Sequence, residues 1–502
     1  MTSVFPANGT ATPRPRIPAG LLNSDIVKVI AILLVFAWFP IQSAPWRSVN
    51  DADLWWHLRA GEWIVQHHQL PHTDPFSTTG AGKPWVAYSW PFEVLLFEIV
   101  HSWDLTGVAA FNIAIWMLIV IAVFHLLRGL TPSFWTALAL TFVVGVILPR
   151  SIAARPGTFT VLFFVLELDI LSRVQRNASA RWLALVPLLI WAWACVHVQF
   201  VYGLFLLGLF CIEPILNRFF QYSNSDQVAF NHRLWFTLAI SVPLTFANPY
   251  GAGPYRVLID AFRQSHVFAL INEMRPMDFQ LTVHYLVLCV CLVAAAAVGR
   301  HWPVRPLWLV LFTWAVIMTF RAERDLWLAA VIGAAVIAVT RKSVPRNGVV
   351  NRQVWLASAA CLLGLLVGVL KLGPTNKQLL SIIATEYPVG AVAYIHEHHL
   401  NGPLFNDYDW GGYLIYSLPE IPVVIDGRAN IHGLDEIERS LQTWNAWDGW
   451  DTDPLLQRAN LVVAPRRAAL TRVLASDARF KVLFEDRISV LFQRTPVAAS
   501  RN

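Results

Sequence analysis

Eleven apolar segments, spread over the first three quarters of the chain, constrain the fold more than any other feature of this sequence. A transmembrane helix needs about 20 mostly apolar residues. Of the 502 residues, 56% are hydrophobic and 14% are charged, whereas a soluble domain carries roughly a quarter charged residues. The sequence therefore predicts an α-helical polytopic membrane protein. The expected spans are 25–43, 106–127, 132–149, 157–174, 182–197, 199–217, 234–247, 282–299, 303–320, 325–340 and 353–371.

The loops between these spans differ in charge, and the difference predicts their orientation. With the N-terminus in the cytoplasm, the loops on that side are short and basic, as the positive-inside rule expects. The opposite loops combine acids, arginine, histidine, asparagine and tryptophan. We therefore expect a multi-pass protein of the plasma (inner) membrane whose function lies on the extracytoplasmic face. The net charge of +6 fits basic loops near anionic lipid and does not indicate a nucleic-acid partner.

The two ends of the chain differ from its apolar middle. Residues 1–20 are rich in proline, alanine and threonine and predict a disordered cytoplasmic tail. Residues 21–374 form the predicted transmembrane domain, with a first outer loop at 44–105 that contains an amphipathic interfacial helix at 90–103. Residues 375–502 have ordinary soluble composition and alternate predicted helices with strands, which favours a small extracytoplasmic α/β domain. Its expected helices are 388–400, 410–417, 434–446 and 467–476, and its expected strands are 403–406, 422–426, 460–464, 480–485 and 488–493.

The stretch NDADLWWHLRAGEW directly follows the first span and holds the strongest candidate site. Asp51 and Asp53 are one residue apart, a spacing suited to binding a divalent metal or to supplying a general base. If the following segment is helical, His57 lies one turn on, on the same face. The alternative is structural, with Asp53 as a helix N-cap and the tryptophans anchored at the membrane interface.

Other polar residues of the outer loops are candidates for substrate binding. Aromatic rings beside carboxylates suit sugar binding. In the first outer loop this indicates His72, Asp74, Trp85, Trp90 and Glu93. The alternative is an ordered loop with a simple turn at Asp74-Pro75. Arginines at the outer ends of the spans are candidates as well, because arginine binds phosphate through two parallel hydrogen bonds. The alternative for these arginines is pairing with nearby acids or with lipid headgroups. The arginines at outer span ends are Arg150, Arg155, Arg321 and Arg324.

Further polar side chains lie at the mouths of predicted spans. His197 and Gln199 sit between two spans, where polar residues serve a site or an interhelical hydrogen bond. Asn248, Glu273 and Arg275 share the largest later outer loop. In the C-terminal domain, Asp407, Asp409 and Asp426 suit an acceptor or calcium, although turns between strands are the favoured interpretation.

The first hundred residues resemble the GT-C superfamily of integral-membrane glycosyltransferases. Asp53-Leu54-Trp55-Trp56 and the later Gly82-Lys83-Pro84-Trp85 resemble the Asp-Glu-aromatic and Lys-Pro-Pro loop patterns of protein-mannosyltransferase-like members. The pattern departs at Leu54, where those members have Glu, and at Trp85, where they have Pro. An Asp-Leu-Trp-Trp-His loop with an Asp-Trp-Gly-Gly-Tyr domain also resembles a subgroup of bacterial membrane proteins.

The resemblance implies a reaction. A sugar passes, with inversion, from a polyprenyl-phosphate donor to a protein, lipid or glycan acceptor outside the cytoplasm. Arginine, with or without Mg²⁺ or Mn²⁺ at Asp51 and Asp53, holds the phosphate leaving group, and Asp53 acts on the acceptor hydroxyl. The alternatives are a transporter and a non-catalytic scaffold whose outer domain binds a partner. Acids are few at mid-span, which favours an enzyme over a transporter.

Overall fold

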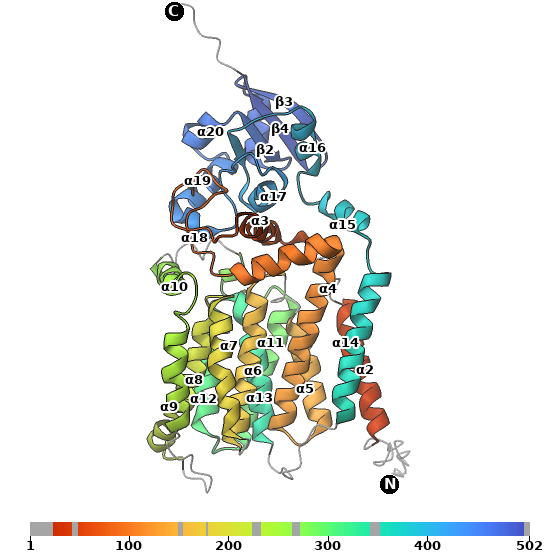
Figure 1. The fold of residues 1–502 in the computed structure, drawn as a ribbon, viewed down its shortest axis with the longest axis vertical. Helices are drawn as coiled ribbons and strands as arrows, with labels where there is room; N and C mark the ends of the chain where they lie inside the picture. The colour runs from red at the N-terminus through yellow and green to blue at the C-terminus, as the bar shows by residue number, and fades with distance from the viewer. Residues whose placement is uncertain are drawn as a thin grey trace, which may run out of the picture.

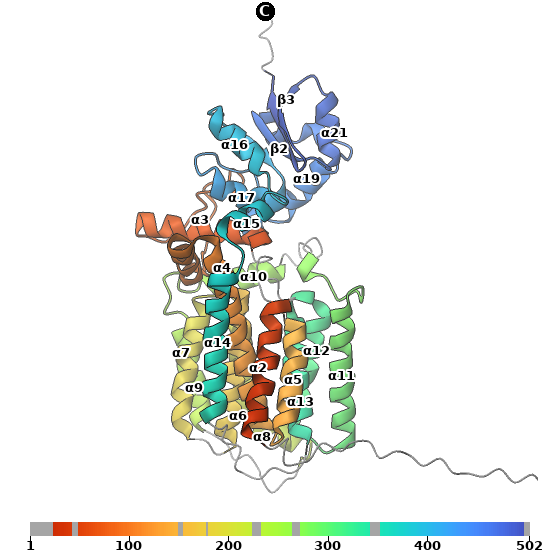
Figure 2. The same ribbon diagram turned by 90° about the vertical axis from the view of Figure 1, so that its right-hand side faces the viewer.

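A computed structural model describes residues 24–42, 49–148, 154–176, 179–222, 232–263, 272–341 and 352–495. Figures 1 and 2 show a bundle of roughly parallel helices at one end and a domain with a β-sheet at the other. The predicted tail 1–20 lies outside the described residues. The bundle comprises α2 (Asp25–Gln42), α4 (Trp90–Leu130), α5 (Phe134–Ile147), α6 (Gly157–Gln175), η3 (Ala180–Ala184), α7 (Leu185–Ala194), α8 (Phe200–Phe219), α9 (His232–Leu244), α11 (Thr282–Arg300), α12 (Pro306–Arg321), α13 (Leu326–Thr340) and α14 (Arg352–Leu372).

The apolar segments fold as helices of a membrane protein. Each of the eleven expected spans coincides with a helix of the bundle. Within the described part of the chain, α4, α8 and α11 are long and apolar enough to cross a membrane. The bent pair Leu356–Leu372 and Asn376–Ile383 adds a fourth if it is counted as one span, and three further apolar helices are shorter. The number of eleven spans therefore stays a prediction.

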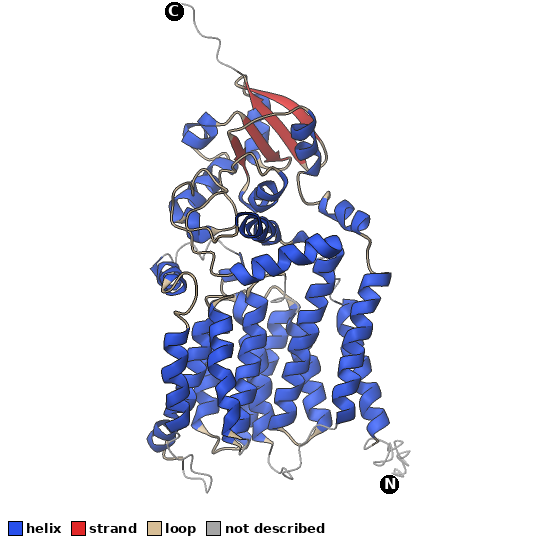
Figure 3. Ribbon diagram, in the orientation of Figure 1, coloured by secondary structure: helices blue, strands red, loops and turns tan. Residues whose placement is uncertain are grey.

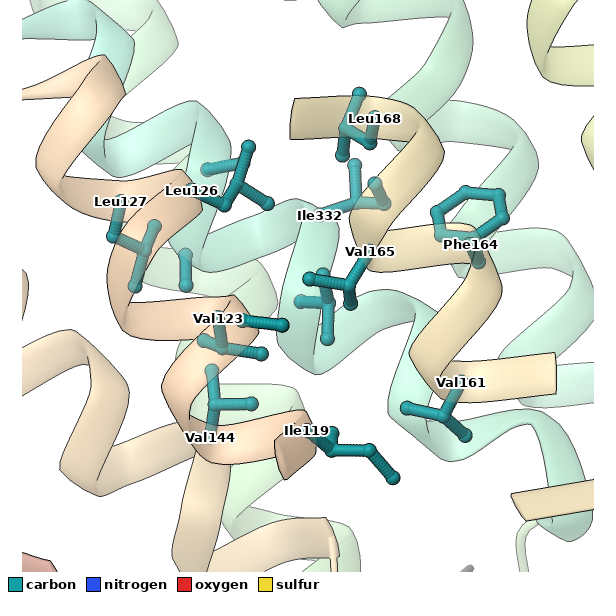
Figure 4. Packing of buried hydrophobic residues seen from close by; sticks show 14 of the residues in the cluster. Ile119, Val123, Leu126, Leu127, Val144, Val161, Phe164, Val165, Leu168 and Ile332 are labelled. Carbon is teal, nitrogen blue, oxygen red and sulfur yellow. The ribbon is translucent and has the colours of Figure 1, made fainter. Parts of the chain in front are cut away.

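The core of the bundle is built from branched aliphatic and aromatic side chains. Figure 4 shows Val123 of α4, Val144 of α5, Val165 of α6 and Ile332 of α13 among the packed residues. Helix α13 is buried along nearly its whole length. A helix that is apolar on all sides is expected at the centre of such a core.

A short layer of helices separates the bundle from the sheet domain. The predicted interfacial helix 90–103 is the first part of α4, and non-helical backbone at Trp103 and Asp104 (φ 50°, ψ −158°) breaks it from the part inside the bundle. In Figure 1 this first part crosses the top of the bundle, and α3 (Ala52–His67) lies next to it. Gly61 allows the contact, because a Cβ there would overlap the carbonyl of Glu93.

The C-terminal part contains a four-stranded sheet, confined to one end of the molecule in Figure 3. The strand order is β1-β2-β4-β3; β1 and β2 are parallel, and the other neighbours are antiparallel. The strands are β1 (Leu404–Asn406), β2 (Leu461–Pro465), β3 (Phe480–Glu485) and β4 (Ser489–Arg494). The helices are α15 (Asn376–Ile383), α16 (Val389–Glu397), α17 (Tyr408–Ser417), α18 (Ala429–His432), α19 (Leu434–Trp444), η7 (Trp450–Thr452), α20 (Pro454–Arg458) and α21 (Ala469–Ser476).

The strand expected at 422–426 does not form, and this prediction is wrong. The side chain of Asn406 takes the place of a strand partner: its Oδ1 accepts from Val424 N at 2.8 Å, and its Nδ2 donates to Ile425 O at 2.8 Å. Val423 instead forms an isolated bridge with Ser77 of the first loop. This segment therefore joins the C-terminal domain to the first loop.

The C-terminal domain also packs on α3 through an aromatic cluster. Trp55 is 2% exposed, and its ring lies 5.1–5.7 Å from those of Tyr387, Tyr413 and Tyr416. For Trp55 the structural alternative of a membrane-interface anchor therefore does not hold, since the ring faces protein. Gly412 of α17 allows close packing, because a Cβ there would lie 2.5 Å from the carbonyl oxygen of Ala52.

Candidate functional site

The site begins at the N-terminus of α3. Asp51, not Asp53, caps this helix, with its Oδ1 accepting from Asp53 N at 2.9 Å. Capping by an acidic side chain satisfies a free backbone N–H and complements the helix dipole. The second carboxylate oxygen of Asp51 accepts from Arg155 Nε at 2.6 Å. Asp51 is therefore both a structural cap and a member of an ionic cluster.

Arg155 is the centre of that cluster. Besides Asp51, its Nη1 lies 3.3 Å from Asp53 Oδ2 and 2.8 Å from Glu273 Oε2. The partners come from the first loop and from η5 (Asn272–Met274), more than 100 residues away on either side. Burial on its own lowers the pKa of Arg155, but the carboxylates of Asp51, Asp53 and Glu273 together raise it well above its usual value. The guanidinium thus stays charged and holds three segments together.

Asp53 is the more accessible of the two aspartates. Its side chain is 24% exposed, whereas that of Asp51 is 7% exposed. Trp56 Nε1 donates to Asp53 Oδ1 at 2.9 Å, which fixes the carboxylate in the first turn of the helix. A reacting group can therefore reach Asp53 more readily than Asp51.

The C-terminal domain approaches Asp53 from the opposite side. A Cβ on Gly427 would overlap Asp53 Oδ1, so a larger residue there would require the carboxylate to shift. Burial and then the charge of Asp53 raise the pKa of Tyr408, whose hydroxyl donates to Gly427 O at 3.2 Å. Burial and then Asp409 raise the pKa of Asp407 to about 7. The domain thus supplies polar groups to the space around Asp53.

Beneath Asp53 lies a buried polar layer. His57 and Glu93 are 3% and 0% exposed, with 3.4 Å between Nδ1 and Oε1, and Ser89 Oγ donates to Glu93 Oε1 at 2.8 Å. Burial raises the pKa of Tyr88 to about 12, with the charges of Arg324, Glu93 and Asp53 acting on the same hydroxyl. Tyr88 therefore lies within electrostatic range of both Asp53 and Arg324.

Arg324 connects this layer to a cavity of about 380 Å³. Its Nη1 lies 3.5 Å from Met274 Sδ, and among the described residues it forms no ion pair. Gln199 and Tyr202 fix the neighbouring Asp325 through hydrogen bonds of 2.9 Å each. The cavity lies between α8, α10 (Gly253–Arg263), α12 and η6 (Glu323–Asp325). It is lined by Val198, Gln199, Val201, Tyr202, Leu258, Ala261, Met274, Pro276, Met318, Arg321, Ala322, Arg324 and Asp325.

Asp74 takes part in a buried ionic contact between the first loop and the C-terminal domain. Its Oδ1 accepts from Arg428 Nη1 at 2.7 Å, and Arg428 Nη2 donates to Asp426 Oδ2 at 2.7 Å. The Arg428 guanidinium also lies over the Trp85 ring, 4.8 Å from its centroid. Ser77 Oγ donates to the second oxygen of Asp74. Asp74 and Trp85 thus contact protein groups here, and substrate binding by them stays a prediction.

The remaining candidates are distributed around the cluster. His197 is buried, and its Nδ1 lies 2.9 Å from Thr160 Oγ1. His72 contacts the Tyr250 ring edge-on. Asn248 stabilises a turn by accepting from Tyr250 N at 2.9 Å. Trp90 is the first residue of α4. The backbone carbonyl of Arg275 accepts a hydrogen bond from Glu323 N. Arg321 lines the cavity. Arg150 lies outside the described residues.

The carboxylates near Asp53 do not fit a metal ion as they stand. Asp51, Asp53 and Glu273 converge on the Arg155 guanidinium, which fills the position that a cation would take. Within the described ranges, no group of three or more His, Cys, Asp or Glu side chains is arranged to hold a metal. Mg²⁺ or Mn²⁺ at Asp51 and Asp53 stays a prediction, and it requires Arg155 to move first.

The sequence did not indicate two residues near the candidate site, Arg428 and Tyr88. Arg428 lies in the stretch VVIDGRAN, in which only Asp426 was a candidate. A single arginine in a segment rich in turn-forming residues does not indicate that it has a buried partner. Tyr88 lies between Trp85 and Trp90, and nothing in its local pattern separates it from other loop aromatics. Both gain their positions from contacts distant in the sequence.

Comparison with known proteins gives a structural likeness alone. No family model matches the sequence, and no curated protein matches it. Among solved structures, the chain is similar to the Archaeoglobus fulgidus oligosaccharyltransferase in the apo form. The TM-score is 0.49 at 12% sequence identity, over 88% of this chain and 69% of that one. At this level of identity and overlap the likeness concerns the course of the chain alone and not its activity.

Proposed function

We propose that the protein is a membrane glycosyltransferase that moves a sugar from a polyprenyl-phosphate donor to an acceptor hydroxyl beneath the C-terminal domain. One observation carries the proposal. The partly exposed carboxylate of Asp53 and the guanidinium of Arg324 both lie within electrostatic range of the buried Tyr88, and Arg324 lines an apolar cavity at the end of the helical bundle. A carboxylate base beside a phosphate-binding arginine suits this chemistry.

The cavity suits the lipid-linked donor. Most of its lining is apolar, including Val198, Val201 and Met318, and this lining can receive the first isoprene units. Arg321 and Arg324 supply guanidinium groups at the same cavity, and arginine binds phosphate through paired hydrogen bonds. The sugar would then extend from the phosphate toward Asp53.

The proposed reaction is a single displacement with inversion at the anomeric carbon. The acceptor hydroxyl gives its proton to Asp53, and its oxygen forms a bond to the anomeric carbon. The bond from that carbon to the phosphate oxygen breaks, and its electron pair leaves with the polyprenyl phosphate. Arg324 stabilises the negative charge that develops on the leaving group.

The acceptor would enter from the side of the C-terminal domain. Tyr408 and Asp409 of that domain lie within electrostatic range of Asp53 and would offer hydrogen-bond partners for a hydroxylated protein, lipid or glycan. Arg155 orients Asp51 and Asp53 in this scheme. In the orientation that the loop charges predict, the reaction takes place on the extracytoplasmic face of the inner membrane.

A transfer assay tests the function. The purified protein is reconstituted in liposomes with a panel of polyprenyl-phosphate monosaccharides carrying label in the sugar, plus a membrane extract as the source of acceptors. We expect the wild type to release polyprenyl phosphate and to move label into a non-donor product. Arg324→Gln should raise the KM for the donor about tenfold, because one charge-assisted contact is lost, while the exposed Arg479→Gln should behave as wild type.

Two results would contradict the proposal. Labelled donor that crosses the liposome membrane intact would indicate a transporter. Absence of both transfer and transport with every donor of the panel would favour a scaffold that binds a partner.

A further inference from the structure

A second cavity lies at the end of the bundle remote from the C-terminal domain, at the bottom in Figure 1. Its volume is about 410 Å³. It lies where α6 and α13 end and α12 begins, so it is separated from Asp53 by the length of the bundle. It is lined by Leu130, Ser172, Gln175, Arg176, Tyr222, His301, Pro303, Val304, Arg305, Trp308, Val339 and Thr340.

Positive charge exceeds negative charge around this cavity. Arg305 Nη2 pairs with the buried Glu213 at 2.6 Å, and Arg173 Nε pairs with Asp169 at 2.8 Å. Arg176 donates through Nε to the backbone oxygen of Ser172 at 2.9 Å. Across the part of the chain that the structure describes, no carboxylate pairs with Arg176. One guanidinium at the cavity thus lacks a carboxylate in direct contact among the described residues.

Two of these guanidinium groups crowd the same point. A Cβ on Gly129 would lie 2.9 Å from Arg176 Nη2 and 3.4 Å from Arg173 Nη2. Like charges at such proximity repel each other, and an anion between or beside them relieves the repulsion. The glycine leaves the space that this arrangement needs.

Ser172 adds a neutral donor at the same wall. It is 2% exposed, it lines the cavity, and its Oγ has no hydrogen-bond partner among the described residues. A buried hydroxyl without a partner costs free energy, so a ligand that accepts from it is favoured. Ser172 and Arg176 are four residues apart on α6 and its C-cap, and side chains at this spacing share one face.

We propose that this cavity binds a phosphate group through the Arg176 guanidinium and the Ser172 hydroxyl. Guanidinium and hydroxyl groups are suited to phosphate oxygens. The apolar side chains of Leu130, Val304 and Trp308 beside them fit the chain of a phospholipid, and the position at one end of an apolar bundle is that of a lipid headgroup layer. Free phosphate offers the same oxygens and is the other source.

Native mass spectrometry of the full chain in a phosphate-free detergent tests the site. The probes are phosphatidylglycerol, diacylglycerol as the phosphate-free counterpart, and inorganic phosphate. We expect phosphatidylglycerol to bind more tightly than diacylglycerol, and Arg176→Gln to weaken that binding about tenfold because a charge-assisted contact is lost. Ser172→Ala removes only an unpartnered hydroxyl and should weaken binding several-fold without unfolding the protein.

The matched control is Arg181→Gln, which removes an exposed charge from η3 and should leave binding unchanged. Competition distinguishes the two sources. Tight lipid binding that millimolar phosphate does not displace assigns the site to a headgroup, and binding of phosphate without lipid preference assigns it to the free ion; either outcome supports a phosphate site. Equal binding of phosphatidylglycerol and diacylglycerol, or unchanged binding in both variants, would overturn it.

Discussion

At the scale of single residues, Arg155 determines how the acidic groups near α3 are used. One guanidinium contacts Asp51, Asp53 and Glu273 and neutralises part of their charge. Its side chain is 30% exposed, so each contact is weaker than in a dry interior. The aspartates keep the geometry that the reaction needs because Arg155 and Trp56 hold them from two sides.

Arg155→Ala should therefore destabilise the protein by about 1–2 kcal/mol, since three carboxylates lose their shared counter-charge. The vacated space should also admit a divalent cation, so Mg²⁺ or Mn²⁺ should raise the melting temperature of the variant but not that of the wild type. Thermal unfolding in detergent, with and without the metal, measures both effects. Equal metal stabilisation of wild type and variant would show that Arg155 does not occupy the cation position.

The sequence revealed the members of this cluster but not their contacts. Asp51, Asp53, Arg155 and Glu273 each stood out as polar residues at the ends of apolar segments. Arg155 is 104 residues from Asp51 and 118 from Glu273. Only the packing of the bundle brings such distant positions into contact. The local sequence pattern around each residue does not indicate which other residues it will contact.

At the scale of elements, the contact between α3 and α17 positions the C-terminal domain over Asp53. Gly412 brings the backbone of α17 against Ala52, and Gly427, in the segment that leads into α18, lies against Asp53. Hydropathy predicted the helices well because burial in lipid or in a bundle needs long apolar runs. The strand at 422–426 was mispredicted because a side-chain amide, that of Asn406, satisfies its backbone instead of a neighbouring strand.

Gly412→Val should separate these two helices. The added side chain meets the carbonyl of Ala52, and overpacking of this kind costs about 1–3 kcal/mol. We expect faster hydrogen exchange in α3 and α17 while the helices of the bundle keep their protection. The control is Gly208→Ala in α8, where a Cβ meets nothing within 4 Å. Unchanged exchange in α17 of the valine variant would refute a close helix contact.

At the scale of the whole molecule, a buried ionic contact couples the C-terminal domain to the first loop. The side chains of Arg428, Asp74 and Asp426 are at most 1% exposed. Burial alone would raise the pKa of Asp426. The charges of the Arg428 guanidinium and of His432 outweigh this effect and hold the pKa of Asp426 far below its usual value. Sequence analysis missed this contact, since each partner lies in an ordinary turn-forming stretch.

Arg428→Met should release the domain from the loop. It leaves two buried carboxylates without the guanidinium that they share, and removal of one member of such a group costs about 3–5 kcal/mol. Limited proteolysis should then cut within residues 72–85, which the wild type protects. Arg479→Met, which breaks an exposed pair with Asp477, should cost less than about 1 kcal/mol. Equal resistance of the Arg428 variant would mean that other contacts hold the domain.

The rate of sugar transfer by Asp53→Asn tests the central claim most directly. Asparagine keeps the acceptor oxygen for Trp56 and nearly the same volume, but it cannot take a proton. With donor saturating, the account predicts a loss of at least about 100-fold in kcat, the scale of general-base catalysis, with an unchanged melting temperature and full activity in the exposed Asp435→Asn. Transfer by Asp53→Asn at the wild-type rate would contradict the assignment of Asp53 as the base.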